Sequence, residues 1–212
     1  MRALVTGGSR GIGRAICDYF RAKGLEVESP SRESLDLSKK IFLTDNKFDI
    51  VVNCAGINPI NCIYLSGDEE VMQVNFRAPL DIIQSCLPHM SSQKYGRIVN
   101  IGSIWIEFAK PGRLDYSCSK QALHGLTKMV AAEYGHNNVL CNTVSPGFVA
   151  TEMTYKNNTK EQIEKLTKSI PVGRMAAPEE IAPLVYHLTV ENSFINGQNI
   201  IIDGGYSCCS IQ

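Results

Sequence analysis

Tyr116 and Lys120 lie four residues apart, and Ser103 precedes Tyr116 by thirteen residues. Side chains four apart on a helix share one face, so the ammonium and the phenol would lie close together. A nearby ammonium favours the phenolate, and we therefore expect the pKa of Tyr116 to fall well below its usual value of about 10. With the Ser103 hydroxyl holding a substrate oxygen, these groups would form a proton-transfer site. The alternative is an ordinary exposed pair on a helix.

A glycine-rich segment, Gly7-Gly-Ser-Arg-Gly11-Ile-Gly13, follows a short apolar run and precedes an amphipathic helical pattern. Glycines let the backbone approach a pyrophosphate closely, and a helix N-terminus offers unpaired N–H groups and the positive end of its dipole. At a junction between a strand and a helix, this segment predicts a dinucleotide site rather than a simple loop.

Apolar runs alternate with helical patterns along the chain, which predicts βαβ units and a parallel sheet. The expected strands are Ala3–Thr6, Leu25–Ser29, Ile50–Asn53, Arg97–Ile101, Val139–Val144 and Asn199–Ile202. The expected helices are Gly11–Ala22, Asp68–Leu87, Tyr116–Tyr134 and Pro178–Leu188, with a shorter one within Lys160–Lys168. We therefore expect an α/β fold, a doubly wound parallel sheet in one domain over residues 1–212.

Several motifs in this order resemble the short-chain dehydrogenase/reductase family. They are the glycine turn Thr6–Gly13, the segment Val52–Gly56 with Cys54 in place of an asparagine, Asn75, the trio Ser103, Tyr116 and Lys120, the segment Ser145–Thr151, and the closing segments Gly173–Ile181 and Gly197–Gly205. The closing half of the chain is similar to the 3-oxoacyl-carrier-protein reductase branch. This resemblance implies a Rossmann-type fold and hydride transfer between a nicotinamide cofactor and a ketone or secondary alcohol.

The resemblance also implies a role for each matching residue. Tyr116 would be the general acid, Ser103 would position the substrate oxygen, Lys120 would lower the pKa of Tyr116 and contact the nicotinamide ribose, and Asn75 would anchor a water in a proton relay. Packing at a helix kink is the alternative for Asn75. The residues that would bind the cofactor are Gly7, Ser9, Arg10, Gly11, Ile12, Gly13, Arg32, Asp36, Leu37, Asn53, Ala55, Gly56, Tyr116, Lys120, Pro146, Gly147, Val149 and Thr151.

One departure from the family pattern concerns the chain after the second expected strand. The family usually has a helix and a third strand there, but here Arg32 is followed almost at once by Asp36 and Leu37. A parallel neighbour needs a crossover of about a dozen residues or more. We therefore expect this helix and strand to be missing, leaving about six strands in the family order 2-1-4-5-6-7 and a more exposed adenine end.

The same region bears on the choice of cofactor. An acidic residue after the second strand would bind a ribose 2′-hydroxyl, but the segment here reads Ser29-Pro-Ser-Arg32. In the family, basic residues at the positions of Arg10 and Arg32 accompany NADP(H), so NADP(H) is expected over NAD(H). Both arginines could instead be ordinary solvated charges. Asp36 and Leu37 would touch the adenine ring.

The substrate region is less defined by the sequence. Ile104, Trp105, Ile106, Phe108, Phe148, Met153 and Tyr155 could line an apolar pocket or serve only as packing. Lys110 and Arg113 could meet an anionic group, although a solvated surface is the favoured interpretation. Residues 152–170 are polar and are interpreted as a substrate lid, with an ungated surface loop as the alternative.

Composition excludes several other classes of protein. The 21 basic and 21 acidic residues balance, which argues against an electrostatic partnership with nucleic acid or a membrane surface. No apolar run approaches the length of a membrane span, and no signal-peptide pattern is present. The eight cysteines form no C-x-x-C and no cluster with histidine, so we expect no metal site and a reducing cytoplasm. Cys17, Cys54, Cys86 and Cys141 lie in apolar patterns and are expected to be buried thiols. Cys208 and Cys209 are expected to be exposed.

Two other functions remain open at this stage. The shortened second-strand region is reminiscent of sugar-nucleotide reductases and isomerases, although little chain remains for a nucleotide-sugar domain. A non-catalytic cofactor sensor is the other. The helices around Asp68–Leu87 and Tyr116–Tyr134 resemble those that join subunits in the family, so a homodimer or homotetramer is expected.

Overall fold

A computed structural model describes residues 1–65 and 67–208, and it contains one sheet of six parallel strands. The strands are β1 (Arg2–Val5), β2 (Glu26–Glu28), β3 (Ile50–Asn53), β4 (Gly96–Ile101), β5 (Val139–Pro146) and β6 (Asn199–Ile202). Their order is β2-β1-β3-β4-β5-β6, so the predicted Rossmann-type topology is confirmed. All strand pairs are parallel, and Val5 lies opposite Val52 in the register of β1 and β3.

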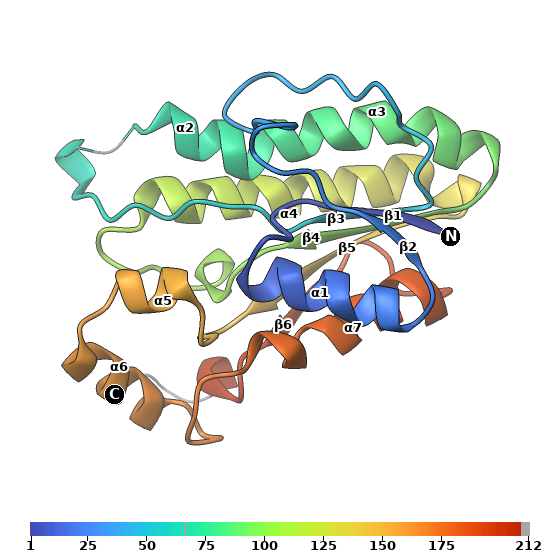
Figure 1. Ribbon diagram of the computed structural model, residues 1–212. Helices are drawn as coiled ribbons and strands as arrows, with labels where there is room; N and C mark the ends of the chain where they lie inside the picture. Colours follow the sequence, from blue (N-terminus) through green and yellow to red (C-terminus); the bar gives the residue numbers. More distant parts are fainter. Residues whose placement is uncertain (66, 209–212) are drawn as a thin grey trace.

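Helices cover both faces of this sheet (Figure 1). On one face lie α1 (Gly11–Ala22) and α7 (Ala182–Tyr186), and on the other lie α2 (Glu69–Met72), α3 (Ala78–Ser92) and α4 (Leu114–Tyr134). Short 3₁₀ turns span Ile63–Leu65, Ile104–Ile106, Gly135–Asn137, Pro178–Glu180 and Tyr206–Cys208. Covering both faces explains why β3, β4 and β5 are buried along their whole length.

Two apolar clusters, one on each face, hold the layers together. Successive strand residues point to opposite faces, so Ala3 and Val5 join one cluster and Leu4 joins the other. The first contains Ile16 and Phe20 of α1, and the second contains helix residues such as Ile82 of α3. Burying one such large aliphatic side chain contributes about 1.5–3 kcal/mol. The two clusters thereby hold the carboxyl ends of the strands in place.

The helix predicted over Asp68–Leu87 is interrupted and longer than expected. A π-helical turn, Gln73–Arg77, separates α2 from α3, and α3 continues through Pro88 to Ser92. A π turn inserts one residue into a helical repeat and often marks a functional position. Here it contains Asn75, whose side chain is fully buried. The helix predicted over Pro178–Leu188 likewise passes from a 3₁₀ turn through α7 to a π turn, His187–Glu191.

The prediction that a crossover helix and its strand are missing is confirmed. No helix or strand lies between Glu28 and Ile50, and residues 32–35 form only a turn. The segment instead packs apolar side chains against the α3 face, with Ile41 and Phe48 buried and Leu37 partly buried. Extended chain thus replaces the absent helix as a cover for that part of the core.

Residues 152–170 form two short helices rather than an irregular loop. They are α5 (Glu152–Lys156) and α6 (Lys160–Ser169), and neither has a buried residue. Thr159 begins α6 with a capping box, because its hydroxyl accepts from the Gln162 N–H and the Gln162 side chain accepts from the Thr159 N–H. This segment is therefore locally ordered but weakly attached to the core.

The described residues show neither a membrane-spanning helix nor a cluster of metal ligands. No helix in residues 1–65 and 67–208 has the length and apolar character needed to span a membrane. Across the same ranges, no three His, Cys, Asp or Glu side chains cluster as a metal site. Cys17, Cys86 and Cys141 are buried free thiols, Cys54 is partly buried and Cys208 is exposed, whereas Cys209 lies outside the described residues.

Candidate active site

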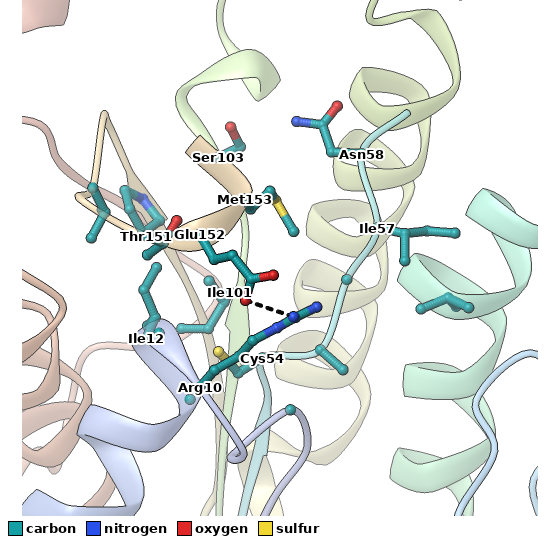
Figure 2. A pocket seen from close by; sticks show the side chains of 18 of the residues that line it. Arg10, Ile12, Cys54, Ile57, Asn58, Ile101, Ser103, Thr151, Glu152 and Met153 are labelled. Atoms are coloured by element: carbon teal, nitrogen blue, oxygen red, sulfur yellow. Dashed lines mark hydrogen bonds and ion pairs between the residues drawn. The ribbon is translucent and has the colours of Figure 1, made fainter. Parts of the chain in front are cut away.

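A cavity of about 600 Å³ opens beyond the carboxyl ends of β1, β3, β4 and β5. That edge of a parallel α/β sheet is the usual position for a ligand, and the volume lies within the range of about 300–1,000 Å³ seen for ligand pockets. The glycine turn lines one end of the cavity, and Ser103, Tyr116 and Lys120 line it further along. Figure 2 shows part of this wall, with Arg10 and Ile12 low in the view and Ser103 and Asn58 above them.

The glycine turn has a backbone that side chains would obstruct. Gly7 has a φ of +73°, and a Cβ there would lie 2.8 Å from the Ala55 Cα. A Cβ on Gly13 would overlap the carbonyl group of Gly7. The absence of a side chain at Gly13 therefore lets the first turn of α1 pack against the end of β1. No side chain caps α1, so its N-terminal N–H groups can receive an anionic group. These features fit the pyrophosphate of a dinucleotide.

Tyr116 is the third residue of α4, and Ser103 follows the end of β4. Desolvation raises the pKa of Tyr116 above 10, and the smaller effect of the Ser103 hydroxyl, which favours the phenolate, does not reverse this. The expectation of a strongly lowered Tyr116 pKa is therefore wrong for the protein without its cofactor. Position on one helix face placed the ammonium near the ring, but it could not show how completely the phenol is desolvated.

Lys120 is only 3% exposed and lines the same wall of the cavity. Its Nζ lies 5.7 Å from the centre of the Tyr116 ring and donates to the Ile101 carbonyl oxygen at 2.8 Å. Burial lowers the pKa of Lys120 to about 8, with a smaller opposing effect from Cys54. The amine therefore exchanges a proton more readily near neutral pH than an ordinary lysine does.

Asn75 does not line the cavity but lies directly behind it. Its Oδ1 accepts from the Ile57 N–H at 2.9 Å, and its Nδ2 donates to the Ile57 carbonyl oxygen at 2.9 Å and to the Ser119 hydroxyl at 3.0 Å. A Cβ on Gly56 would lie 3.2 Å from Asn75 Oδ1 and 3.5 Å from Lys120 Nζ. Asn75 thus holds the backbone of the segment that follows β3.

Most of the expected cofactor residues face this one cavity. Those that line it are Gly7, Ser9, Arg10, Gly11, Ile12, Gly13, Arg32, Asp36, Leu37, Ala55, Gly56, Tyr116, Lys120, Pro146, Gly147, Val149 and Thr151. A Cβ on Gly147 would lie 2.6 Å from the Asp203 Cβ, so close packing requires glycine there. Thr151 caps α5 through its hydroxyl and also contacts the open face of Gly11.

Asn53, unlike the other expected cofactor residues, lies behind the cavity wall. It does not line the cavity, and its side chain is 1% exposed between the strands. Its Nδ2 donates to Asn100 Oδ1 at 2.8 Å, and Asn100 in turn donates to the Thr127 hydroxyl at 2.9 Å. Asn53 therefore joins β3, β4 and α4. Its inward orientation follows from strand alternation, which the motif alone did not reveal.

Both arginines expected near the cofactor already have acidic partners. Arg10 donates to Glu152 at 2.7 Å, across the cavity opening from the turn to α5, as Figure 2 shows. Arg32 Nε lies 3.8 Å from Asp36 Oδ1, and Arg32 Nη2 lies 3.7 Å from Glu70 Oε1. Each ion pair is solvent-exposed and therefore weak, about 0–1 kcal/mol, so an incoming phosphate can replace the carboxylate.

Comparison with known proteins gives a consistent result. Residues 31–207 match a family model described as enoyl-(acyl carrier protein) reductase. The 3-oxoacyl-[acyl-carrier-protein] reductase of Aquifex aeolicus is 34% identical, and the alignment covers 96% of each chain. The chain belongs to the short-chain dehydrogenase/reductase family. It is accordingly an NAD(P)-dependent oxidoreductase that acts on CH–OH or keto groups.

Two solved members of the family have folds similar to that of this chain. A 4-hydroxyisoleucine dehydrogenase mutant complexed with NADH and succinate has a TM-score of 0.89 and 28% identity, over all of both chains. A gluconate 5-dehydrogenase from Burkholderia cenocepacia in complex with NADP and tartrate has a TM-score of 0.83 and 25% identity, covering 99% of this chain and 96% of that one. The short-chain dehydrogenase therefore has the family fold over nearly its whole length despite the shortened segment.

Several residues of this short-chain dehydrogenase were not identified from the sequence. Asn58 lines the cavity beside the substrate end, and Ser119 supports Asn75, but neither belongs to a motif. Lys110 and Arg113 were interpreted as solvated, yet both line the cavity and Arg113 is only 6% exposed. In the sequence, the one indication of a role for Lys110 and Arg113 is that their positive charges lie close to Tyr116. Of the expected apolar residues, Trp105, Phe148 and Met153 line the cavity.

Proposed function

We propose that this short-chain dehydrogenase transfers hydride reversibly between NADP(H) and a ketone or secondary alcohol. The observation that carries the proposal is that Tyr116, Ser103 and Lys120 line the same cavity as the glycine turn. When bound, the nicotinamide supplies or accepts the hydride. The chain must then orient the carbonyl oxygen and move one proton to or from it.

Tyr116 is proposed as the group that donates this proton during reduction. A raised pKa keeps the phenol protonated at neutral pH, which suits a general acid, and Ser103 lines the same cavity. The Ser103 hydroxyl can also donate to the oxygen as negative charge develops there. Lys120, with its pKa lowered to about 8, can return a proton to Tyr116 from solvent. We assign Asn75 a positioning role through Ile57, which leaves a water relay compatible with its second Oδ1 lone pair.

NADP(H) is the proposed cofactor because, among the described residues, no unpaired carboxylate lines the adenine end of the cavity. Glu28, the acid nearest the end of β2, pairs with Arg2 at 3.2 Å and does not line the cavity. Arg10 and Arg32 both do, and each can pair with a 2′-phosphate. The two solved relatives contain NADP in one case and NADH in the other, so direct affinity measurement decides the matter.

Residues 152–170 are proposed to act as a lid over the bound substrate. Three polar contacts join the segment to the rest of the site within the described residues. Glu152 pairs with Arg10, Asn157 Nδ2 donates to the Asn58 carbonyl oxygen at 3.1 Å, and the Thr154 hydroxyl donates to the Val149 carbonyl oxygen at 2.6 Å. The first two can break and re-form as ligands enter. Protection of this segment from protease by cofactor plus substrate would support the lid.

The decisive experiment measures cofactor absorbance with a panel of ketones and alcohols. We expect turnover with the wild type and a loss of at least about 100-fold in kcat in Tyr116→Phe, because the ring remains and only the transferable proton is removed. Tyr64→Phe is the matched control, since Tyr64 is 94% exposed and does not line the cavity. Near-full turnover in Tyr116→Phe would refute the assignment. Cofactor binding without turnover of any carbonyl would favour a sensor.

We also propose that the chain forms homo-oligomers in the cytoplasm. The long helices α3 and α4 lie together on one face, and Met129 on α4 is 54% exposed. We propose that this face joins two subunits, as closed two-fold assemblies are common. Light scattering of the full chain tests the proposal, and a strictly monomeric mass at micromolar concentration would contradict it.

A further inference from the structure

The cations that line the cavity differ in whether an acid neutralises them. Three acidic side chains line it, Asp36, Glu70 and Glu152, and all three pair with Arg10 or Arg32 near the glycine turn. At the Tyr116 end, Lys110 and Arg113 also line the cavity. Within residues 1–65 and 67–208, neither of these two forms an ion pair. Positive charge therefore remains unbalanced beside the proposed proton donor.

Arg113 is held by Asn58, but most of its N–H donors have no hydrogen-bond partner within the described residues. Its Nη1 donates to Asn58 Oδ1 at 2.7 Å and to the Asn58 carbonyl oxygen at 3.4 Å, and the guanidinium makes no other hydrogen bond within the described residues. A guanidinium carries five N–H donors. With only 6% of the residue exposed, water cannot solvate it freely. A buried charge without a counter-ion is costly, and an anionic ligand would remove that cost.

Lys110 reaches the same region from the loop before α4. Its Nζ lies 5.3 Å from the centre of the Trp105 ring and 5.9 Å from that of Phe148, two residues that line the cavity. Burial lowers its pKa, and the nearby Arg113 lowers it further. Partial burial likewise lowers the pKa of Arg113, which only Tyr116 offsets. Within the part of the chain that the structure describes, Arg113 is the charged group that acts on Lys110, and Tyr116 is the titratable group that acts on Arg113.

We propose that Arg113 and Lys110 form an anion subsite, so that the substrate carries a carboxylate or a phosphate close to the carbonyl that is reduced. The inference rests on the proposed function, since it names the substrate class of that site. Arg113 precedes Tyr116 by three residues, at the start of α4, and influences the titration of that phenol. The N-terminal end of α4 adds a favourable dipole for the anion.

The same contacts connect the anion subsite to the lid. Asn58 accepts from Arg113 through Oδ1 and from Asn157 through its carbonyl oxygen. Asn58 therefore lies between the start of α4 and the segment after α5. A ligand anion on Arg113 would meet a residue that is already fixed, so little side-chain entropy is lost on binding.

The first test compares matched neutral and anionic ketones. Acetoacetate is paired with its methyl ester, and dihydroxyacetone phosphate with dihydroxyacetone, which separates a carboxylate from a phosphate. We expect the wild type to prefer the anion of one pair by about tenfold or more in kcat/KM, as charged hydrogen bonds allow. Arg113→Gln should bring the ratio of the two kcat/KM values close to one, and this ratio cancels any effect that loss of the charge has on Tyr116 with both ketones. An equal or reversed preference in the wild type would overturn the proposal.

Lys110→Gln provides a second variant, because Lys110 makes no hydrogen bond in the described residues and its loss should not disturb folding. It should reduce the anion preference in the same direction, and if Arg113→Gln does not fold, an unchanged preference in Lys110→Gln overturns the proposal. Arg113→Lys should retain part of the preference. Arg14→Gln is the control, since it removes one exposed positive charge from α1 outside the cavity.

A binding measurement separates this inference from the proposed reaction. Calorimetry of malonate and of inorganic phosphate with the full chain needs no turnover. We expect one of them to bind the wild type at least tenfold more tightly than Arg113→Gln. Binding of this kind without reduction of any ketone would count against the proposed reaction alone. Turnover of ketones with no Arg113-dependent anion binding would count against the subsite alone.

Discussion

The Lys120 ammonium lies 3% exposed and donates one hydrogen bond, to the Ile101 carbonyl oxygen. Its pKa of about 8 in the fold means that the charged form is disfavoured there relative to the unfolded chain. Each unit of pKa shift corresponds to about 1.4 kcal/mol, so below pH 8 burial of this charge lowers the free energy of unfolding by up to about 3 kcal/mol. The position is thus retained at the expense of stability.

Replacing Lys120 by Met should therefore raise the free energy of unfolding by about 1–3 kcal/mol at pH 7 while abolishing turnover. The unfolded chain holds more protons than the folded one between pH 8 and about 10.5, so wild-type stability rises with pH over that interval. The advantage of the variant should shrink accordingly. Urea unfolding at a series of pH values measures this. A variant less stable than the wild type at pH 7 would contradict the argument.

Residue identity could be predicted well at this scale, but residue environment could not. The interval between Tyr116 and Lys120 suffices to predict that they share one helix face, whereas the position of Ser103 beside them was implied by the family resemblance. The direction of the Tyr116 pKa depends on desolvation by chain segments far away in the sequence. The same reason explains Arg113, whose burial depends on the loop around Asn58.

Among the elements, the π turn at Gln73–Arg77 connects helix geometry with the cavity. Asn75→Ala would leave the Ile57 N–H and carbonyl without their partners, and we expect a loss of about 1–3 kcal/mol in the free energy of unfolding. We expect kcat to fall as well, because Ile57 lines the cavity. Chemical unfolding and steady-state kinetics measure the two effects.

Asn75→Asp and Gln73→Ala serve as comparisons for this prediction. Aspartate keeps the acceptor for the Ile57 N–H but loses both donor contacts, so intermediate stability is expected. Gln73 lies in the same turn, and its Nε2 donates to the Lys39 carbonyl oxygen away from Ile57. Equal losses in Asn75→Ala and Gln73→Ala would show that the turn, rather than the contact with Ile57, matters.

The missing crossover was predictable because chain length limits geometry. The few residues between Arg32 and Asp36 cannot hold a crossover, and the observed strand order follows. The π turn was not predictable in the same way. An apolar pattern with helical period continues through an inserted residue, so the sequence around Asn75 indicates only one long helix.

For the whole molecule, the Arg10–Glu152 pair joins the glycine turn to the lid across 142 residues of chain. If Arg10 binds the 2′-phosphate of NADP(H), Glu152 competes with the cofactor for the same guanidinium. Glu152→Gln should therefore tighten NADPH binding about two- to fivefold at low salt, the range expected for an exposed pair. The gain should diminish at high salt because solvent ions screen exposed charges.

Fluorescence titration of NADPH and NADH with wild type and variant tests this competition. Glu164→Gln is the matched control, since Glu164 is exposed on α6 of the same segment and forms no ion pair within the described residues. NADH, which lacks the 2′-phosphate, should show no gain. Weaker NADPH binding in Glu152→Gln, or an equal effect on both nucleotides, would contradict the model.

Loss of a strand also changes how the molecule meets its neighbours. With nothing outside it, β2 becomes a boundary of the sheet, and its outward N–H and C=O groups could template pairing with a foreign chain. Three features oppose such self-association: a length of three residues, the exposed carboxylates Glu26 and Glu28, and Pro30 shortly afterwards. Together these features disfavour the pairing of another chain along the uncovered edge of the sheet.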